Sequence, residues 1–363
     1  MSTHRRLVAV AAVLLSGATA HAQSVERFTA DSVISLDVFG GENVSNLPQI
    51  IIDASAGMRI GDHWQAFFRP WFRQPRPTTP NGDAPPWDVE IYQAGLRYER
   101  PGAIATRVDL GYIVSPIGLG MLDSRANLNP TIGGHISYFV PMLPFEPTGP
   151  RASAISSTYP LGASATVSAG HWDAHAALVN SSPTRNYVVG SDASPHQAAN
   201  VVAGAGVTPV VGLRLGVSTA HGPYATADEI TGGAPADGRD ATLAGLEGEY
   251  SFAYTVIRGE WMRTSFETTG SDAIAYEWFI QALQTLAPRW FVAARHEGTS
   301  APPTRTAAAT GSRTTLRVVE TTAGYRVTPE ITLRASYYTR RFYGAASWDQ
   351  QFAGSIVWAR RWW

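Results

Sequence analysis

Apolar and polar residues alternate with a period of two along most of the chain, as they do in β-strands that bury one face. Segments 64–73, 104–114 and 213–218 all show this alternation. In segment 331–340 one face carries Ile331, Leu333, Ala335 and Tyr337, and the other carries Thr332, Arg334, Ser336 and Arg340. The pattern predicts strands throughout the chain, but it suits a soluble β-sandwich as well as a barrel.

The lengths of the connections separate these two folds. Tight turns with sequences such as "GD", "PGA" and "PE" alternate with long polar connections, at 74–86, 115–150, 182–197, 222–240 and 298–312. Short turns at one end and long loops at the other are typical of a transmembrane β-barrel. A Greek-key sandwich would mix connection lengths at both ends.

Counting strands between these turns predicts about sixteen. One strand lies near 32–40 and a closing strand covers 347–362. Between them lie the hairpins 49–60/63–73, 87–100/103–114, 151–169/171–181, 198–208/211–221, 241–252/254–266, 273–287/289–298 and 312–328/330–342. Pro70 cannot donate to a strand ladder, so it predicts a bulge. The expected fold class is all-β, a transmembrane antiparallel up-and-down barrel.

The beginning of the chain reads as an export signal. Residues 1–22 combine basic residues, an apolar run and a small-x-small cleavage site at 20–22. We expect residues 23–363 to form the barrel. The sequence has no cysteine, so it offers no disulfide or thiol chemistry. A net charge of −1 argues against a nucleic-acid partner.

The chain ends on two tryptophans, which a strand ending at a membrane interface would explain. Phe352, Ile356, Trp358 and Trp362 share one face of the closing strand. In this respect the sequence resembles outer-membrane β-barrel proteins, whose last strand ends in an aromatic residue read by the insertion machinery. The resemblance implies export to the outer membrane and contact with its lipids and with that machinery.

The longest connection, residues 115–150, is unusually apolar for a segment in water, so we expect its side chains to be covered. In position and length it resembles the third external loop of bacterial porins, which folds into the lumen and narrows it. The resemblance implies a constriction loop and a homotrimer. A surface lid or a subunit contact would also cover the apolar residues.

Charged side chains on the expected inner face are candidates for selectivity. The residues predicted to line the pore are Arg59, Arg69, Arg73, Arg97, Arg107, Asp109, Asp123, Glu146, Arg334 and Arg340. If the loop places Asp123 opposite Arg69 and Arg107, an electric field crosses the constriction. Alternatively, these arginines pair with wall carboxylates such as Asp53 and only hold the shape.

Signals for catalysis are weak. No G-x-S-x-G, P-loop or H-E-x-x-H motif occurs. His171, Asp173 and His175 follow each other on one strand face, about 6.6 Å apart, too far to share one ion. We expect no enzyme, cofactor or metal, but a porin that passes small hydrophilic solutes or ions. The alternatives are an outer-membrane lipid hydrolase and a plugged structural or adhesion barrel.

Overall fold

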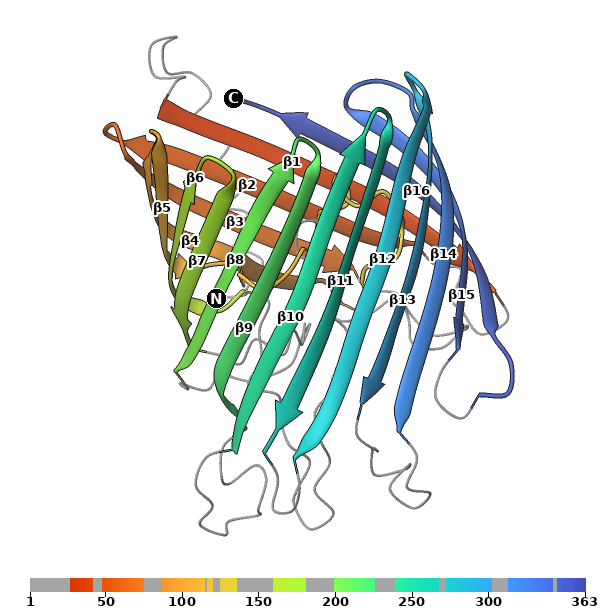
Figure 1. Ribbon diagram of the computed structural model, residues 1–363. Coiled ribbons are helices and arrows are strands. Elements are labelled where there is room, and N and C mark those ends of the chain that lie inside the picture. Colours follow the sequence, from red (N-terminus) through yellow and green to blue (C-terminus); the bar gives the residue numbers. More distant parts are fainter. Residues whose placement is uncertain are drawn as a thin grey trace.

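A computed structural model describes residues 27–41, 48–74, 86–114, 116–119, 125–135, 159–180, 199–225, 239–267, 272–301, 313–341 and 345–363. Antiparallel strands make up most of this part of the chain (Figure 1). They are β1 (Phe28–Gly40), β2 (Gln49–Ile60), β3 (Trp64–Gln74), β4 (Asp88–Arg100), β5 (Ile104–Tyr112), β6 (Leu161–Ala169), β7 (Trp172–Val179), β8 (Asn200–Val210), β9 (Leu213–Ala225), β10 (Arg239–Phe252), β11 (Thr255–Phe266), β12 (Ala273–Ala287), β13 (Trp290–Ala301), β14 (Thr314–Arg326), β15 (Ile331–Arg341) and β16 (Asp349–Arg361). The predicted signal peptide lies outside the described residues. No helix in the described ranges has the length and apolar character needed to cross a bilayer.

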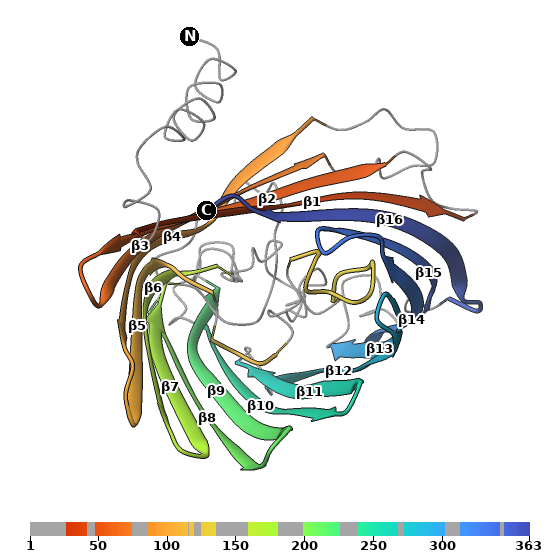
Figure 2. The same cartoon turned by 90° about the horizontal axis from the view of Figure 1, so that it is seen from above.

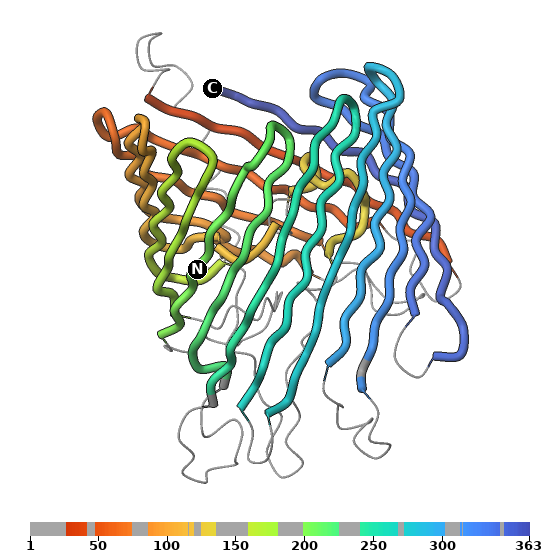
Figure 3. The backbone as a smooth tube through the Cα atoms, in the orientation of Figure 1, coloured from red at the N-terminus to blue at the C-terminus, as the bar shows by residue number. Residues whose placement is uncertain are grey.

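The strands form a closed ring (Figures 2 and 3). Each strand pairs with its neighbours in sequence, and β1 also pairs with β16, from Asp31 opposite Arg361 to Gly40 opposite Phe352. Closure leaves no strand edge exposed, as a barrel that faces lipid requires. The prediction of a closed barrel of about sixteen strands is confirmed.

Short turns gather at one end of the barrel and long connections at the other (Figure 1). Gly61 and Gly212 adopt φ values of +84° and +89° in two of these turns, a conformation that glycine reaches without a Cβ clash. The turn after β10 is different, because Ala253 takes φ +49° there. Both the start of β1 and the end of β16 lie at this short-turn end.

Strand positions follow the predicted hairpins closely. The expected strands 241–252 and 312–328 are present as β10 and β14. The register between β3 and β4 shifts between Arg69 and Pro70, which confirms the predicted bulge. The strand expected at 151–169 starts at Leu161 in the structure, and residues 151–158 lie outside the described part.

The period of two separates an outer apolar face from an inner polar one. On β16, Phe352, Ile356 and Trp362 are 67%, 49% and 45% exposed, as predicted for the outer face, whereas Ser355 is buried. The Trp362 indole Nε1 donates to the hydroxyl of Ser32 at 2.9 Å, so the last residues are tied to the first strand. Outward aromatic residues recur near the short turns: Trp64, Trp172, Tyr250, Phe252 and Trp290.

Candidate functional site: the barrel lumen and its internal loop

Part of the connection between β5 and β6 lies against the inner wall. We call its described residues (113, 114, 116–119, 125–135, 159 and 160) the internal loop; Figure 2 shows its orange and yellow segments inside the ring. Ile113 and Ile117 are buried in one cluster with inward side chains of β7–β11: Ala177, Val179, Val202, Ala220, Leu243 and Met262. The first residues of the loop therefore cross the lumen from β5 towards β11.

A wall carboxylate holds the loop where this crossing ends. The Leu119 amide donates to Glu260 Oε2 of β11 at 2.6 Å, and Glu260 is 6% exposed. A buried carboxylate needs hydrogen-bond donors, and the loop backbone supplies one. This contact fixes the loop backbone rather than a particular loop side chain.

Arg334 of β15 makes the densest contact with the middle of the loop. Its Nη1 donates to the carbonyl oxygens of Ala126 at 3.0 Å, Asn129 at 2.8 Å and Thr131 at 2.7 Å. Its Nη2 donates to Ser355 Oγ at 2.8 Å, so the guanidinium connects the wall to three carbonyl groups of the loop. Arg334 lies on the inner face, but it is 5% exposed, and both of its Nη atoms are engaged by protein groups.

Glu320 and Arg295 hold the next residues in the same way. Glu320 Oε1 accepts hydrogen bonds from the Ile132 amide at 2.8 Å and the Gly133 amide at 3.2 Å. Arg295 Nη2 donates to the Gly133 carbonyl at 2.8 Å and lies 3.1 Å from Glu320 Oε2. A Cβ at Gly133 would lie 2.9 Å from that carboxylate, so glycine allows the close approach.

His135 follows on the same wall. Its Nδ1 lies 3.4 Å from Glu297 Oε2 of β13, and its ring packs 4.3 Å from that of Phe279 of β12. Both His135 and Glu297 are 1% exposed. The loop is therefore bound to β13–β15 through buried polar groups and to β12 through the Phe279 ring.

Arg125 and Asp53 form a second anchor on β1 and β2. Arg125 of the loop pairs with Asp31 Oδ1 at 2.5 Å and lies 3.5 Å from Asp53 Oδ1. Asp53 also accepts hydrogen bonds from Nε and Nη2 of Arg69, at 2.8 Å and 2.5 Å. At this anchor the loop contributes the positive charge, the Arg125 guanidinium, and the wall contributes the carboxylates. Asp123 and Glu146, the predicted acidic loop residues, lie outside the described residues.

The end of the loop is held by stacked rings. Tyr159 stacks on Tyr92 of β4 with ring centroids 4.2 Å apart, and Tyr92 stacks on Trp71 of β3 at 4.8 Å. The Arg69 guanidinium lies 5.5 Å and 5.7 Å from the two tyrosine rings. Loop contacts and clusters thus involve side chains from β1–β4 and β7–β16, which is most of the circumference.

Other predicted pore residues pair along the wall towards the ends of the barrel. Asp109 binds both Arg97, at 2.6 Å, and Arg107, at 2.7 Å. Near the long loops, the other predicted arginines pair across neighbouring strands: Arg73 with Asp88 at 3.3 Å, and Arg340 with Asp349 at 2.9 Å. These ion pairs agree with the alternative that inward arginines hold shape.

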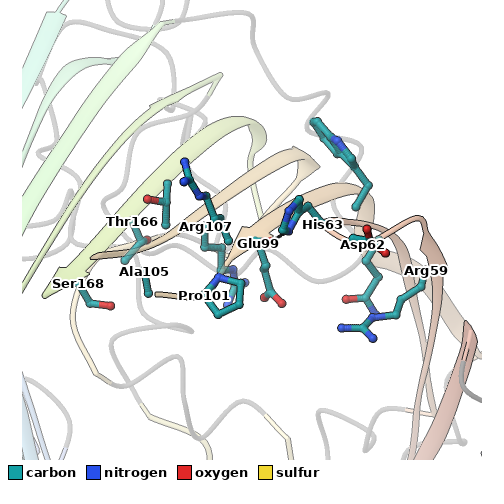
Figure 4. A pocket seen from close by; sticks show the side chains of 13 residues that line it. Arg59, Asp62, His63, Glu99, Pro101, Ala105, Arg107, Thr166 and Ser168 are labelled. Atoms are coloured by element: carbon teal, nitrogen blue, oxygen red, sulfur yellow. Dashed lines mark hydrogen bonds between the residues drawn. The ribbon is translucent and has the colours of Figure 1, made fainter. Parts of the chain in front are cut away.

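An open recess remains at the short-turn end of β2–β6 (Figure 4). Its volume is about 440 Å³, and its lining includes Arg59, Asp62, His63, Gln65, Glu99, Arg100, Arg107, Thr166 and Ser168. Arg59 is exposed, and the Arg107 side chain is 45% exposed despite its pairing with Asp109. The mouth of the lumen therefore presents guanidinium, carboxylate and hydroxyl groups to water.

A third ion network lies flat on β7–β10. Arg214 pairs with Asp173 at 2.8 Å and with Glu247 at 2.5 Å. Gly206 and Gly216 lie beneath it, where a Cβ would come within 2.6 Å of Arg214 and of Glu247, respectively. Asp173, from the His-Asp-His strand, is thus engaged in an ion pair, and no group of three acidic or histidine residues in the described ranges could hold a metal.

Sequence reasoning missed several residues that hold the loop: Arg125, Glu260, Arg295, Glu297 and Glu320. The alternation alone places Arg295 and Glu297 on one face with Phe291 and Ala293, so it contains part of the signal. Their partner lies more than 150 residues away in the loop, and the alternation of a strand does not indicate that separation.

The closed ring and its internal loop define a β-barrel of porin-like architecture. No protein-family model matches the chain, and no curated protein resembles it in sequence. Its structure is similar to Salmonella typhi OmpF, solved with daunomycin (TM-score 0.60, 11% identity, 92% of this chain and 97% of that one). It is also similar to the anion-selective porin from Comamonas acidovorans (0.56, 10%, 92% and 99%) and to OmpT, an outer-membrane protein of Vibrio cholerae (0.54, 13%, 92% and 97%). At these identities the similarity establishes the fold.

Proposed function

We propose that this protein is an outer-membrane porin through which small hydrophilic solutes or ions diffuse passively. A barrel of sixteen strands is too wide for its own side chains to fill. The observation that carries the proposal is the bonding of the internal loop to the inner wall by Glu260, Glu320 and Arg334. A loop fixed in this way narrows the lumen without depending on flexible contacts.

The recess at the short-turn end supports a preference for anions. Arg59, Arg100 and Arg107 line it together with two carboxylates, Asp62 and Glu99. Deeper arginines such as Arg69 are compensated by Asp53, so the mouth contributes more uncompensated positive charge than the loop region. The anion-selective porin of Comamonas acidovorans has the same fold.

Single-channel recording in planar bilayers across a tenfold KCl gradient tests this proposal. The wild-type barrel should conduct and should prefer chloride. Arg59→Gln/Arg107→Gln should move the reversal potential towards the potassium value, because Asp109 keeps Arg97 while the recess loses two charges. Arg317→Gln/Arg341→Gln removes two charges from the outer face and serves as the matched control. Equal reversal potentials in all three proteins would contradict the assignment.

A plugged structural barrel is the second candidate. It is favoured by the spread of loop contacts, which involve β1–β4 and β7–β16. A plugged barrel would fold and insert normally but would show no unitary currents. Conductance of the folded, inserted protein therefore separates the two candidates.

We further propose that the barrel resides in the outer membrane with its long loops outside, and that it assembles as a trimer. The outward apolar face and the aromatic residues at the short-turn end support the placement. OmpT of Vibrio cholerae, which has this fold, was solved in a trimer form (TM-score 0.52, 12% identity, 92% of this chain and 98% of that one). Mass measurement of the detergent-purified protein should give three copies, and a monomer in all detergents would refute this part.

A further inference from the structure

Four arginines gather on the outer wall of β11–β15, near the long loops. The outer arginine patch consists of Arg263, Arg313, Arg317 and Arg341 with the rings of Tyr276 and Trp278. Arg317 and Arg341 are exposed and alternate with inward side chains such as Val318 and Arg340. The patch therefore lies on the face that the proposed placement turns to lipid.

Strand register brings the members of the patch together. Trp278, Gly298, Arg317 and Arg341 are successive partners across β12–β15. The Trp278 indole lies over Gly298, where a Cβ would be only 3.0 Å from the ring, and the Arg317 guanidinium lies 5.4 Å from the ring centre. The glycine leaves room for the ring to lie on the wall as a platform for the guanidinium.

Arg313 is positioned by backbone groups. Its Nη2 donates to the carbonyl oxygens of Ile274 at 2.6 Å and Ser300 at 2.8 Å, and its Nε donates to Ser300 Oγ at 2.8 Å. The guanidinium also lies 5.7 Å from the Tyr276 ring. On the next strand, Arg263 is the register partner of Tyr276. Two arginines thus flank this tyrosine as Arg317 flanks Trp278.

The patch lacks the compensation that the inner wall shows. Most inward arginines pair with carboxylates, but none of these four arginines forms an ion pair with a carboxylate in the part of the chain that the structure describes. Arg317 and Arg341 are directly opposite each other on neighbouring strands, where like charges repel. The nearby Asp272 accepts a hydrogen bond from Ser265. An external anion between the two arginines would relieve the repulsion.

At the same level along the barrel axis, the outer surface on the other side of the barrel is apolar. Outward side chains near the long-loop ends of β1, β4, β7 and β8 include Val38, Ile91, Leu178 and Val201, all 40% or more exposed. The row of outward arginines is therefore a local feature of the wall formed by β11–β15. In the row below it, Ile280 and Val319 are apolar, and His296 lies between them with its ring 4.6 Å from that of Trp278.

We propose that the outer arginine patch binds the phosphate groups of a lipid headgroup in the outer leaflet. The planar arginine fork binds phosphate through paired hydrogen bonds, and aromatic rings favour the depth of the headgroups. Arginine facing the hydrocarbon core is unfavourable, but near the interface this penalty largely disappears. The inference rests on the proposed outer-membrane placement with the long loops outside.

Native mass spectrometry of the purified barrel in detergent tests the inference. The probes are lipid A with two phosphates, the same lipid without phosphates, and inorganic phosphate. The wild type should bind the diphosphorylated lipid at least tenfold more tightly than the dephosphorylated one. Arg317→Gln/Arg341→Gln should lose roughly tenfold in affinity for the diphosphorylated lipid. Arg289→Gln/Arg360→Gln, which removes two exposed charges at the opposite end, should stay within about twofold.

Four results would overturn it: equal binding of both lipids, equal losses in the two double variants, competition by millimolar inorganic phosphate, or a changed subunit number of Arg317→Gln/Arg341→Gln in lipid-free detergent. The last result would make the patch a contact between copies. Single-channel conductance of the same variant is recorded in parallel as a check of folding, since both residues face outward. A barrel that binds lipid but does not conduct would refute only the porin proposal.

Discussion

Replacing Arg334 by methionine should release the internal loop while leaving the barrel closed. Arg334 Nη1 carries two protons and serves the carbonyl oxygens of Ala126, Asn129 and Thr131, so the variant loses about two full hydrogen bonds to a charged group. At about 1.5–3 kcal/mol each, the loop loses roughly 3–6 kcal/mol of docking free energy. The strands keep their own ladders, so the loss falls on the loop.

The absence of cysteine provides a clean assay. Ile132→Cys places a single thiol on the loop, at a position that is 8% exposed and packs with Phe39 and Ala353. Its rate of reaction with a methanethiosulfonate reagent reports the fraction of time that the loop is detached. A loss of about 3 kcal/mol corresponds to a rate increase on the order of a hundredfold.

Arg340→Met is the matched control for Arg334→Met. Arg340 lies on the same face of β15 and pairs with Asp349 at 2.9 Å, near the long-loop end of the strand. Its replacement should change the thiol reaction rate by less than about twofold, and only Arg334→Met should increase conductance and current noise. Equal reaction rates in the parent and both variants would show that Arg334 does not hold the loop.

Substitutions at two further positions test how turns and glycines shape the barrel. Gly206→Val should displace Arg214 from Asp173, lower the free energy of unfolding by roughly 1–3 kcal/mol and reduce conductance. Unfolding in urea measures the stability, and bilayer recording measures the conductance. Unchanged values of both would refute the close contact. Ala253→Gly should relieve a positive φ at a gain below about 1 kcal/mol, because glycine's extra unfolded-state entropy offsets part of the relief. Ala253→Val should lose stability in the same urea assay, and equal stabilities of the Ala253→Gly and Ala253→Val variants would show that the turn is unstrained.

The barrel could be predicted because its determinants are local. Period-two alternation, tight turns and Pro70 each act within one hairpin, and they defined the strands and the bulge. Even the Arg97–Asp109 ion pair follows from such information, since the short turn after β4 places the two residues opposite each other.

The loop anchors depend on contacts that are remote in sequence. Arg334 lies on the predicted face, yet its partner carbonyls are more than 200 residues away, and backbone carbonyls leave no trace in the residue pattern. Glu260 and Glu320 likewise bind loop amides that any residue would provide. For Arg69 the sequence leaves two roles open, a free pore charge or a pair with Asp53, and the fold pairs it with Asp53 and places its guanidinium beside the ring of Tyr159.

The pairing of β1 with β16 makes the earliest and latest strands mutual partners. Because the hairpins between them pair with their own neighbours, one side of β1 stays unpaired until residues 349–361 join it. A chain without β16 would have two strands with unpaired backbone groups, and each of these strands could pair with another polypeptide. The topology therefore makes the arrival of the last strand the step that must precede sealing of the cylinder.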